Sequence, residues 1–270
     1  MRITLVTSNH PKQKMGGAEY QTWLLAKGLK NRGHSVTLLA TNSDMKNQYV
    51  DDAGVVAVEI PNRHIAGETQ HKESAKQAVE SSQPDIVYIR RFEDISRLAD
   101  VCRANNIPFV SMSVHSMETS PFFLGYHPSQ TIRNVRSKRA LLHFRSFYAI
   151  RDSAVHVCNL RALQTKIEKW YPRKRIETIY NGSPVPEVDS EPKIPSGQVV
   201  WVNNMKRWKR PEVYIDLARH LPDYRFVMVG RLPSGRSGKE IERMLAEATP
   251  NLDDVGPKPV EEANELIRHS

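Results

Sequence analysis

The chain has 270 residues, of which 39% are hydrophobic and 26% are charged, and it carries a formal net charge of +9 at neutral pH. This composition is that of a globular protein with one large or two smaller domains, and no stretch approaches the roughly 20 apolar residues of a membrane-spanning helix. The positive charge indicates an anionic partner, which could be nucleic acid, an anionic lipid surface or a phosphorylated small molecule.

The amino terminus and the two cysteines indicate where in the cell the protein is located. The apolar run in MRITLVTSNHPK is too short for the core of a signal peptide and predicts a first strand instead, so we expect a cytoplasmic protein. Cys102 and Cys158 fall in a predicted helix and at a predicted strand end, without a CxxC pattern. We expect both to be reduced structural thiols.

Short apolar runs alternate with amphipathic stretches of helical length through the first two thirds of the chain. Continuous apolar runs such as SVTLLA indicate a parallel sheet covered on both faces, and the alternation indicates βαβ units. We predict an α/β, doubly wound domain with an irregular stretch at 113–129. Its strands are expected at 3–6, 36–40, 85–89, 107–112, 154–157 and 176–179, and its helices at 18–31, 71–82, 94–105, 130–151 and 160–170.

The composition changes between residues 181 and 197, where four prolines and three serines occur in seventeen residues. Such a segment cannot hold a helix or a central strand, so we predict a linker. A second alternation follows it. Strands are expected at 198–202, at 225–229 and shortly before Gly256, and helices at 211–219, 238–248 and from 261 onward. Because this part is about half the size of a typical domain, the second sheet is expected to be incomplete.

Gly16 and Gly17 stand directly before the first predicted helix. The exposed N–H groups of a helix start favour an anion, so a phosphate or a sugar could approach here. The glycines could equally be required by the backbone geometry of the loop alone. The dinucleotide-binding spacing G-x-G-x-x-G is absent from this junction.

The second predicted domain has a strongly basic strand-to-helix loop. Lys206, Arg207, Lys209 and Arg210 follow the strand at 198–202, and the carboxyl ends of parallel strands are where such sheets bind ligands. A diphosphate fits these charges. A solvated basic loop, or a nucleic-acid patch in which a tryptophan of the loop stacks on a base, would give the same pattern. A P-loop at GRLPSGRSGKE is rejected, since its glycine and serine/threonine positions do not match.

Five segments in their order along the chain resemble the family 4 retaining glycosyltransferases of GT-B fold. They are GGAE at 16–19, RDSAVHVCNLRALQTKI at 151–167, IETIYNGSPV at 176–185, KRWKRPE at 206–212 and FVMVG at 226–230. The resemblance implies an acceptor-side Rossmann-like domain at 1–180, a linker at 181–197 and a partial nucleotide-sugar-binding domain at 198–270. It implies transfer of a sugar from a nucleoside diphosphate sugar to an acceptor hydroxyl, in glycan or glycolipid biosynthesis.

The resemblance also assigns roles to residues of the first domain. It implies that Gly16 and Gly17 face the transferred sugar and the donor phosphates. His115, just after the strand at 107–112, matches a position near the transferred sugar, where it could position a hydroxyl or polarise the reacting centre. Arg90, at the end of the strand at 85–89, is a weaker binding candidate that could simply pair with Glu93 or Asp94.

In the second domain the resemblance points to the donor site. Family members carry an arginine and, five residues later, a lysine that neutralise the donor diphosphate; here the two positions are Asn204 and Lys209. Lys206 or Arg207 could compensate for the asparagine. Gly230 matches a glycine whose backbone lies close to the nucleotide. No metal or other cofactor is implied, and no Asp-x-Asp pattern argues for one.

The family also has two glutamates separated by seven residues, in a segment that we do not find in this chain. We therefore expect the 270-residue chain to be an inactive fragment of the enzyme. The alternative from another class is a non-catalytic nucleotide- or carbohydrate-binding protein. No recognisable motif supports nucleic-acid binding.

The predicted helix at 130–151 is basic and amphipathic, which is also typical of helices that lie on anionic lipid. A helix packed on the core with its charges in water would show the same pattern, so peripheral membrane contact stays open. The residues concerned are Arg133, Arg136, Lys138, Arg139, Arg145 and Arg151, beside Ile132, Val135, Leu142, Phe144 and Phe147.

Overall fold

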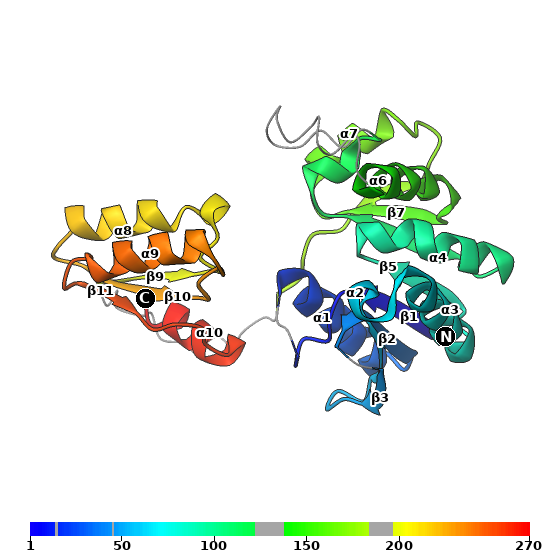
Figure 1. Cartoon of the computed structure of the whole chain (residues 1–270), viewed down its shortest axis with the longest axis horizontal. Coiled ribbons are helices and arrows are strands. Elements are labelled where there is room, and N and C mark those ends of the chain that lie inside the picture. The colour runs from blue at the N-terminus through cyan, green and yellow to red at the C-terminus, as the bar shows by residue number, and fades with distance from the viewer. Residues whose placement is uncertain (14–15, 45, 122–137, 184–196) are drawn as a thin grey trace. The chain divides into compact units, whose positions relative to one another are not determined.

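The structure is a computed structural model that describes residues 1–13, 16–44, 46–121, 138–183 and 197–270 (Figure 1). Residues 1–185 and 186–270 form two compact units. The first, unit 1, holds an eight-stranded sheet and the second, unit 2, a three-stranded sheet. Most of the expected linker, residues 184–196, lies outside the described residues.

Unit 1 alternates strands and helices over its whole length. Its strands are β1 (Arg2–Thr7), β2 (Ser35–Ser43), β3 (Asn47–Val50), β4 (Val56–Pro61), β5 (Ile86–Ile89), β6 (Phe109–Ser113), β7 (Val155–Cys158) and β8 (Ile176–Thr178). Its helices are α1 (Gly17–Asn31), α2 (Arg63–Ala66), α3 (Glu68–Ser82), α4 (Phe92–Ala104), α6 (Lys138–Ala149) and α7 (Arg161–Glu168), with short 3₁₀ helices η1 (Ser116–Thr119) and η2 (Ile150–Asp152).

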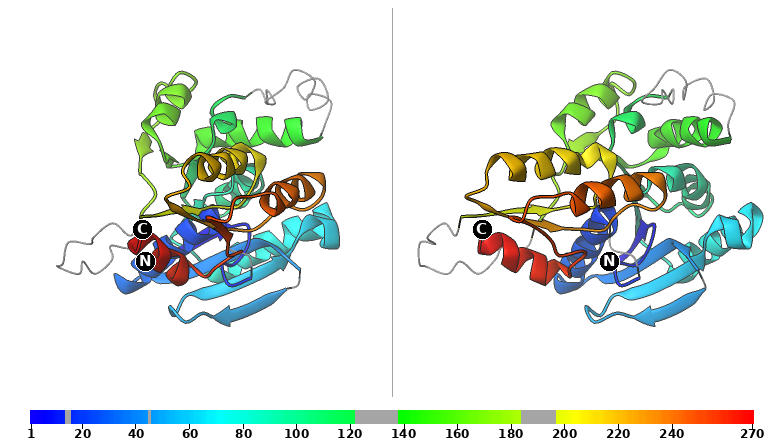
Figure 2. Two further views of the ribbon diagram at one scale, coloured as in Figure 1. Left: turned by 90° about the vertical axis from the view of Figure 1, so that its left-hand side faces the viewer. Right: turned by 60° about the vertical axis from the view of Figure 1, so that its left-hand side comes forward.

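The strands of unit 1 lie in the order β3-β4-β2-β1-β5-β6-β7-β8. All neighbours are parallel except β3 and β4, which are antiparallel. The α/β class and the parallel core of the sheet are therefore confirmed. The sequence interpretation missed the hairpin of β3 and β4 and the short helix α2. Figure 2 shows this hairpin at the margin of the unit.

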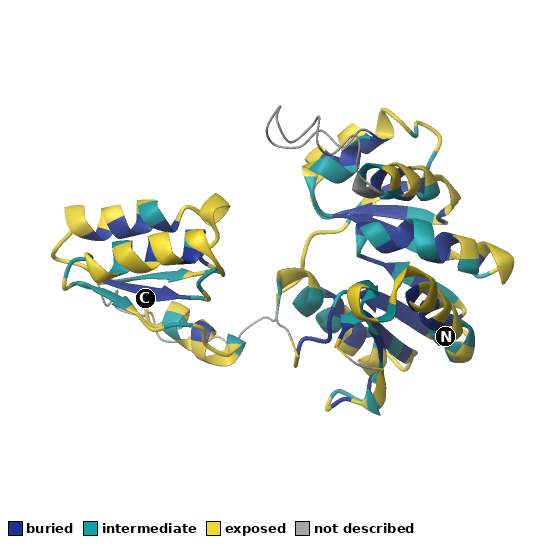
Figure 3. Ribbon diagram, in the orientation of Figure 1, coloured by how far each residue is buried: buried dark blue, intermediate teal, exposed yellow. Residues whose placement is uncertain are grey.

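Helices cover both faces of the large sheet, and alternate strand residues supply the two cores. Leu5 and Leu38 face α1, where they pack with Ala26. Val6 and Leu39 face the other side, where they pack with residues of α3, α4 and α6 such as Val79, Leu98 and Phe147. In Figure 3 the strands of this sheet are largely buried and the exposed residues lie on the outer surfaces of the helices.

Unit 2 is a smaller sheet of the same kind. Its elements are β9 (Gln198–Val202), η3 (Arg207–Lys209), α8 (Pro211–His220), β10 (Arg225–Val229), α9 (Arg236–Ala246), β11 (Leu252–Asp254) and α10 (Val260–Arg268). The strand order is β11-β10-β9, all parallel. Helices α8 and α9 cover one face and α10 the other (Figure 1).

The long basic helix expected at 130–151 is described only from Lys138, where α6 begins, and the part at 130–137 lies outside the described residues. Among the helices that the structure describes, none is long and apolar enough to cross a membrane.

Both cysteines lie where the sequence places them, Cys102 in α4 and Cys158 at the end of β7. Both are buried and free, and burial raises the pKa of each thiol to about 12, so they stay protonated and unreactive.

Candidate functional site

The carboxyl-end edge of the eight-stranded sheet collects the candidate residues of unit 1. β1, β5 and β6 are parallel neighbours, so the segments that follow Thr7, Ile89 and Ser113 leave the sheet on the same side. Arg90 and His115 lie in two of these segments, and the glycine pair lies between β1 and α1 in the third. Ligands of open parallel sheets bind at this edge.

Arg90 is held at this edge as a buried cation, with 8% of its surface exposed. Its Nη2 donates to Oδ1 of Asn181 at 2.9 Å, and its Nη1 to Sδ of Met112 at 3.3 Å. Its Nε has no hydrogen-bond partner among the described residues. A buried N–H without a partner is costly, so Arg90 offers a donor to a bound group.

Glu93 and Asp94, the possible partners of Arg90 in the sequence analysis, form ion pairs with Arg91 instead. Nη2 of Arg91 lies 3.0 Å from Oε2 of Glu93, and its Nη1 lies 3.8 Å from Oδ2 of Asp94. Successive side chains at a strand end point to opposite sides. The carboxylates therefore compensate Arg91, and the hydrogen bonds of Arg90 go to uncharged groups.

His115 caps the amino-terminal end of η1. Its Nδ1 accepts the N–H of Met117 at 3.2 Å, so the neutral ring carries its proton on Nε2. Glu118 closes the cap from the other side, because its Oε2 accepts the N–H groups of Val114 at 2.6 Å and of His115 at 3.1 Å. This reciprocal capping box fixes the backbone that carries His115.

Glu118 was not among the candidates from the sequence. Burial raises the pKa of its carboxyl group to about 7, against the opposing effects of the two backbone N–H groups and the nearby charge of Arg90. The group therefore changes its charge near neutral pH. The available signal was a glutamate three residues after a strand-end cap, but histidine in place of serine or threonine at the cap hid it.

The two glycines of the first loop have different surroundings. A Cβ on Gly16 would overlap the carboxylate of Glu19, which folds back over the start of α1. A Cβ on Gly17 would meet nothing within 4 Å. The backbone of Gly16 is extended, with φ of −134° and ψ of 163°, so conformation alone does not demand glycine there. The space beside Gly17 is the open approach to the helix start.

The loop that leads to these glycines is anchored on the β3–β4 hairpin. Nε2 of Gln13 donates to Oε2 of Glu59 at 2.5 Å, and Nε2 of His10 lies 3.5 Å from Oδ2 of Asp51. Glu59 is fully buried and also accepts the hydroxyl of Tyr49 at 2.9 Å. Burial and this carboxylate raise the pKa of Tyr49. The hairpin that the sequence interpretation missed thus positions the glycine loop.

In unit 2 the basic loop follows β9 at the carboxyl-end edge of the small sheet. Nζ of Lys206 lies 4.8 Å from the ring centroid of Trp208, and Arg210 forms an ion pair with Glu212. Arg207 and Lys209 are exposed, and their side chains have no partner among the residues that the structure describes. The loop therefore presents two uncompensated positive charges.

The other two predicted donor-site residues lie close to this loop. Asn204 is exposed in it, and the backbone carbonyl of Asn204 accepts the N–H of Lys206 at 2.7 Å. A Cβ on Gly230 would overlap the carbonyl of Asn203, so glycine is required by the close approach of two strand ends of the protein itself. The role that the family resemblance implies for Gly230, with its backbone close to the nucleotide, stays a prediction beside this steric requirement.

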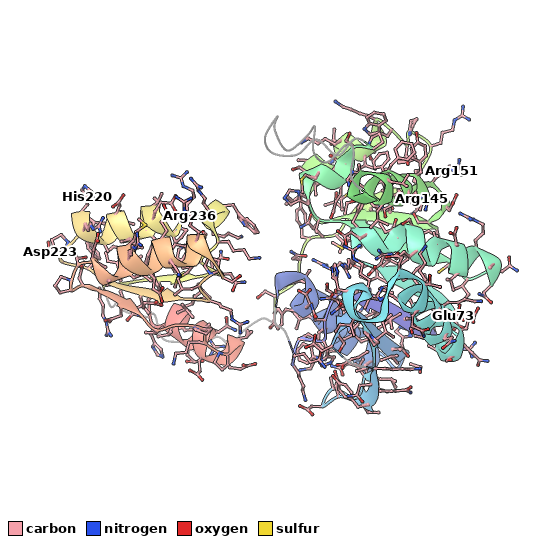
Figure 4. All side chains as sticks on the ribbon, in the orientation of Figure 1. Glu73, Arg145, Arg151, His220, Asp223 and Arg236 are labelled. Carbon is pink, nitrogen blue, oxygen red and sulfur yellow. The ribbon has the colours of Figure 1, made fainter. Side chains whose placement is uncertain are left out.

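Two further cations lie at the same edge and were missed. Arg231 lies two residues after the end of β10, and its carbonyl accepts the N–H of Met205, which ties the two loops together. Arg236 begins α9. Figure 4 shows Arg236 at one end of the small unit and His220 and Asp223 at the other. Both arginines follow a predicted strand, which is the signal that could have identified them.

Among the described residues, no three histidine, cysteine, aspartate or glutamate side chains gather in a group that could hold a metal ion.

Residues 15–185 match the family model described as Glycosyltransferase Family 4, which is the family that the ordered sequence segments resemble. No curated protein sequence matches the chain.

Solved structures match over nearly the whole chain. Sucrose-phosphate synthase from Thermosynechococcus elongatus is 14% identical, with a TM-score of 0.70 and coverage of 99% of this chain and 73% of that one. HepE from Anabaena in complex with UDP-glucose is 16% identical, with a TM-score of 0.64 and coverage of 95% and 69%. A glycosyltransferase from Rickettsia africae is 14% identical, with a TM-score of 0.60 and coverage of 98% and 70%. At these identities the likeness shows the fold, and the GT-B prediction is confirmed.

Proposed function

The chain belongs to glycosyltransferase family 4, and from that premise we propose that the active enzyme transfers a sugar from a nucleoside diphosphate sugar to an acceptor hydroxyl, with retention of the anomeric configuration. Because the paired glutamates of the family are not found in these 270 residues, we propose that this chain binds the donor without appreciable turnover. The edge of unit 2 binds the donor diphosphate, and the edge of unit 1 binds the acceptor and the transferred sugar. UDP is the first nucleotide to test, since HepE was solved with UDP-glucose.

The observation that carries this proposal is the distribution of charge in the β9–α8 loop. Of its four cations, Arg210 is compensated by Glu212 and Lys206 is stacked on Trp208. The remaining two, Arg207 and Lys209, face solvent without a carboxylate. Two free positive charges at the carboxyl-end edge of a parallel sheet match a diphosphate in charge and place.

Catalysis would then rest on positioning and on charge neutralisation of the leaving diphosphate. Lys209 and Arg207 stabilise the charge that develops on the leaving group. In unit 1, the capped loop holds His115 in a fixed orientation toward the sugar, and Arg90 supplies a buried donor. No step in this scheme requires a metal ion, because side chains of the protein neutralise the negative charge of the diphosphate.

The test is a measurement of nucleoside diphosphate release and of nucleotide binding on the same preparation. A panel of nucleotide sugars is offered with crude acceptor extracts, and released UDP, GDP and ADP are quantified. The proposal expects saturable binding of one nucleotide, weakened at least tenfold in Lys209→Ala, and no appreciable release by the 270-residue chain. Arg243→Ala removes one exposed charge from the far end of α9 and is the matched control. Equal nucleotide affinity in all three proteins would contradict the donor site, and robust release by the 270-residue chain would contradict the expected lack of turnover.

Binding without transfer is the second candidate function. Asn204 favours it, because the resemblance implies a cation at this position and an asparagine leaves the diphosphate with less compensation. Saturable UDP binding in calorimetry is expected for both functions, so acceptor-dependent UDP release is the measurement that separates them. Release above the rate of spontaneous donor hydrolysis supports the transferase.

We also propose that unit 1 makes peripheral contact with anionic membranes. Leu141, Phe144 and Tyr148 are 54%, 41% and 48% exposed on one side of α6. They line a groove of about 1360 Å³ between α3, α4 and α6, together with basic residues such as Arg145 (Figure 4). Exposed aromatic and basic groups on one helix are typical of interfacial binding. Flotation with anionic vesicles but not neutral ones is expected, and equal flotation with both would refute the contact.

A further inference from the structure

A second, smaller cavity lies at the carboxyl-end edge of the large sheet, and five elements converge on it. Its volume is about 50 Å³. No carboxylate lines it among the described residues. The lining residues are Thr41 and Asn42 from the end of β2, Arg63 and His64 from α2, His71 from α3, Arg91 after β5 and Arg97 from α4.

The size of the cavity suits a small polar group. One water needs about 10–15 Å³ of such space, so about 50 Å³ accommodates a group of several heavy atoms but not a sugar ring. The walls provide guanidinium, imidazole, amide and hydroxyl groups. Such a wall has N–H donors in several directions, which is what a tetrahedral oxyanion requires.

Two of the three arginines are already oriented by carboxylates behind the wall. Nη1 of Arg97 lies 3.2 Å from Oδ1 of Asp94 and its Nε lies 3.2 Å from Oε1 of Glu68. Nη1 of Arg91 donates to Oγ1 of Thr41 at 3.2 Å. The side chain of Arg97 is 6% exposed and that of Asp94 is 3% exposed. These donors are therefore held in fixed directions before any ligand arrives.

Arg63 supplies the uncompensated charge. Its guanidinium has no partner among the residues that the structure describes, whereas each of the other two arginines has a carboxylate. The side chain of Asn62 accepts the N–H groups of His64 and Ile65 and so caps the short helix that carries Arg63. The φ of 78° at Gly67 turns the chain sharply into α3, which brings His71 to the same cavity.

His71 adds a buried imidazole ring to the wall of the cavity. It is 2% exposed, and its Nδ1 lies 2.9 Å from the carbonyl of Pro61, so Nδ1 carries a proton. Nε2 of the neutral ring can then accept the proton of a monoprotonated phosphate.

The cavity adjoins the candidate site of unit 1. Arg91 follows Arg90 at the end of β5, although their side chains point to opposite sides. Oγ1 of Thr41 lies 2.8 Å from Oδ2 of Asp94 and 3.1 Å from the carbonyl of Thr7, at the end of β1. From there the chain continues into the loop that carries Gly16 and Gly17. The cavity and the residues Arg90, Gly16 and Gly17 therefore share the carboxyl-end edge of the large sheet.

We propose that this cavity binds the phosphate group of the acceptor, so that the acceptor is a phosphorylated small molecule or a phosphorylated lipid head group. The identification of the ligand as the acceptor rests on the proposed function. The binding of an anion in this cavity does not depend on sugar transfer. Arg63 provides the free charge, Arg91 and Arg97 provide oriented donors, and His71 provides an acceptor for the proton of the phosphate.

The experiment is a titration of the whole chain with inorganic phosphate, followed through the ring resonances of His64 and His71. Saturable shifts of both rings are expected. Arg63→Gln should weaken phosphate binding about tenfold, since it removes the one uncompensated charge. Glu68→Gln should strengthen binding severalfold, because it releases Arg97 from a competing carboxylate. Arg173→Gln, an exposed arginine before β8 at the opposite edge of the sheet, should leave the affinity within twofold.

The source of the phosphate is decided by competition. If glycerol 3-phosphate and lysophosphatidic acid displace inorganic phosphate equally well, the site recognises the phosphate group alone. If the lipid binds more tightly, the ligand is a phosphorylated lipid head group. Unsaturable shifts, or equal affinity in wild type, Arg63→Gln and Arg173→Gln, would overturn the site. UDP binding measured on the same variants keeps the two proposals apart, since loss of the phosphate site leaves UDP affinity in unit 2 unchanged.

Discussion

The carboxyl-end edges of the two sheets are built in opposite ways. In unit 1 the charged groups are buried and held: Arg90 bonds to Asn181, and Glu118 caps the loop of His115. In unit 2 the charged groups are exposed, and Arg207 and Lys209 have no partner among the described residues. The charged groups at the edge of unit 1 are held in place before a ligand binds, whereas Arg207 and Lys209 at the edge of unit 2 are not held by other side chains of the described residues.

This difference suggests a division of labour. An edge with fixed donors recognises the shape of a ligand, because little ordering remains to be done when the ligand binds. An edge with free cations attracts a strongly charged ligand and becomes ordered around it, with a strong dependence on salt. The first suits an acceptor that must be distinguished from similar molecules. The exposed edge of unit 2 suits a diphosphate, a group that is common to many ligands and is recognised by its charge.

The largest effect is expected for the organised edge. Arg90→Ala removes a buried cation and leaves Oδ1 of Asn181 unpaired, so unit 1 should lose about 3 kcal/mol of unfolding free energy. Arg207→Ala, in the exposed loop, should stay within about 0.5 kcal/mol of wild type. Urea denaturation of both variants measures the difference. Equal midpoints for the two would mean that unit 1 is not organised around Arg90.

A second contrast concerns glycines that look alike in the sequence. Gly230→Ala would place a Cβ against the carbonyl of Asn203 and should destabilise unit 2 by about 2 kcal/mol. Gly17→Ala enters open space at the start of a helix and should be neutral or stabilising by about 0.5 kcal/mol. Thermal unfolding of both variants checks the prediction, which fails if Gly230→Ala unfolds at the wild-type temperature.

The third effect depends on pH. The pKa of Glu118 is raised from its ordinary 4.5 to about 7 in the folded protein, chiefly by burial. Its contribution to stability is therefore complete below about pH 4.5 and is lost as the pH rises through 7. Glu118→Gln keeps an acceptor oxygen without the charge. Relative to wild type it should gain up to about 2 kcal/mol at pH 8 and nothing at pH 4, at 1.36 kcal/mol per pKa unit less an allowance for relaxation.

The control for this prediction is Glu177→Gln, which neutralises an exposed carboxylate paired with Arg175. Denaturant unfolding between pH 4 and pH 8 should give parallel stability curves for this control and the wild type. If Glu118→Gln also runs parallel to the wild type, Glu118 does not titrate near neutral pH in the folded protein.

There is a physical reason why some elements of the fold were predicted from the sequence and others were not. The parallel core and the basic loop at 206–210 were predicted, since hydrophobic periodicity and strand-end position are local signals. The β3–β4 hairpin was missed because its first strand is polar and only its second, Val56–Pro61, is apolar. It belongs to a sheet margin, where burial does not impose a strong pattern.

Residues of the site whose role depends on distant neighbours could not be predicted. Arg90 and Arg91 are adjacent in the sequence, and only the structure assigns the carboxylates to the second of them. The phosphate-sized cavity needs Thr41, Arg63 and Arg97, which come from three elements and carry no shared motif. The requirement for glycine at 230 likewise depends on the carbonyl of a neighbouring strand end.

The central claim is that the free cations of unit 2 bind a nucleoside diphosphate, and calorimetric titration of the chain with UDP tests it most directly. We predict saturable binding that weakens about tenfold, or about 1.4 kcal/mol, in Lys209→Ala and that falls as salt is raised. Arg243→Ala, an equal loss of charge at the far end of α9, should bind as wild type does. Identical affinities for the wild type, Lys209→Ala and Arg243→Ala would contradict the account.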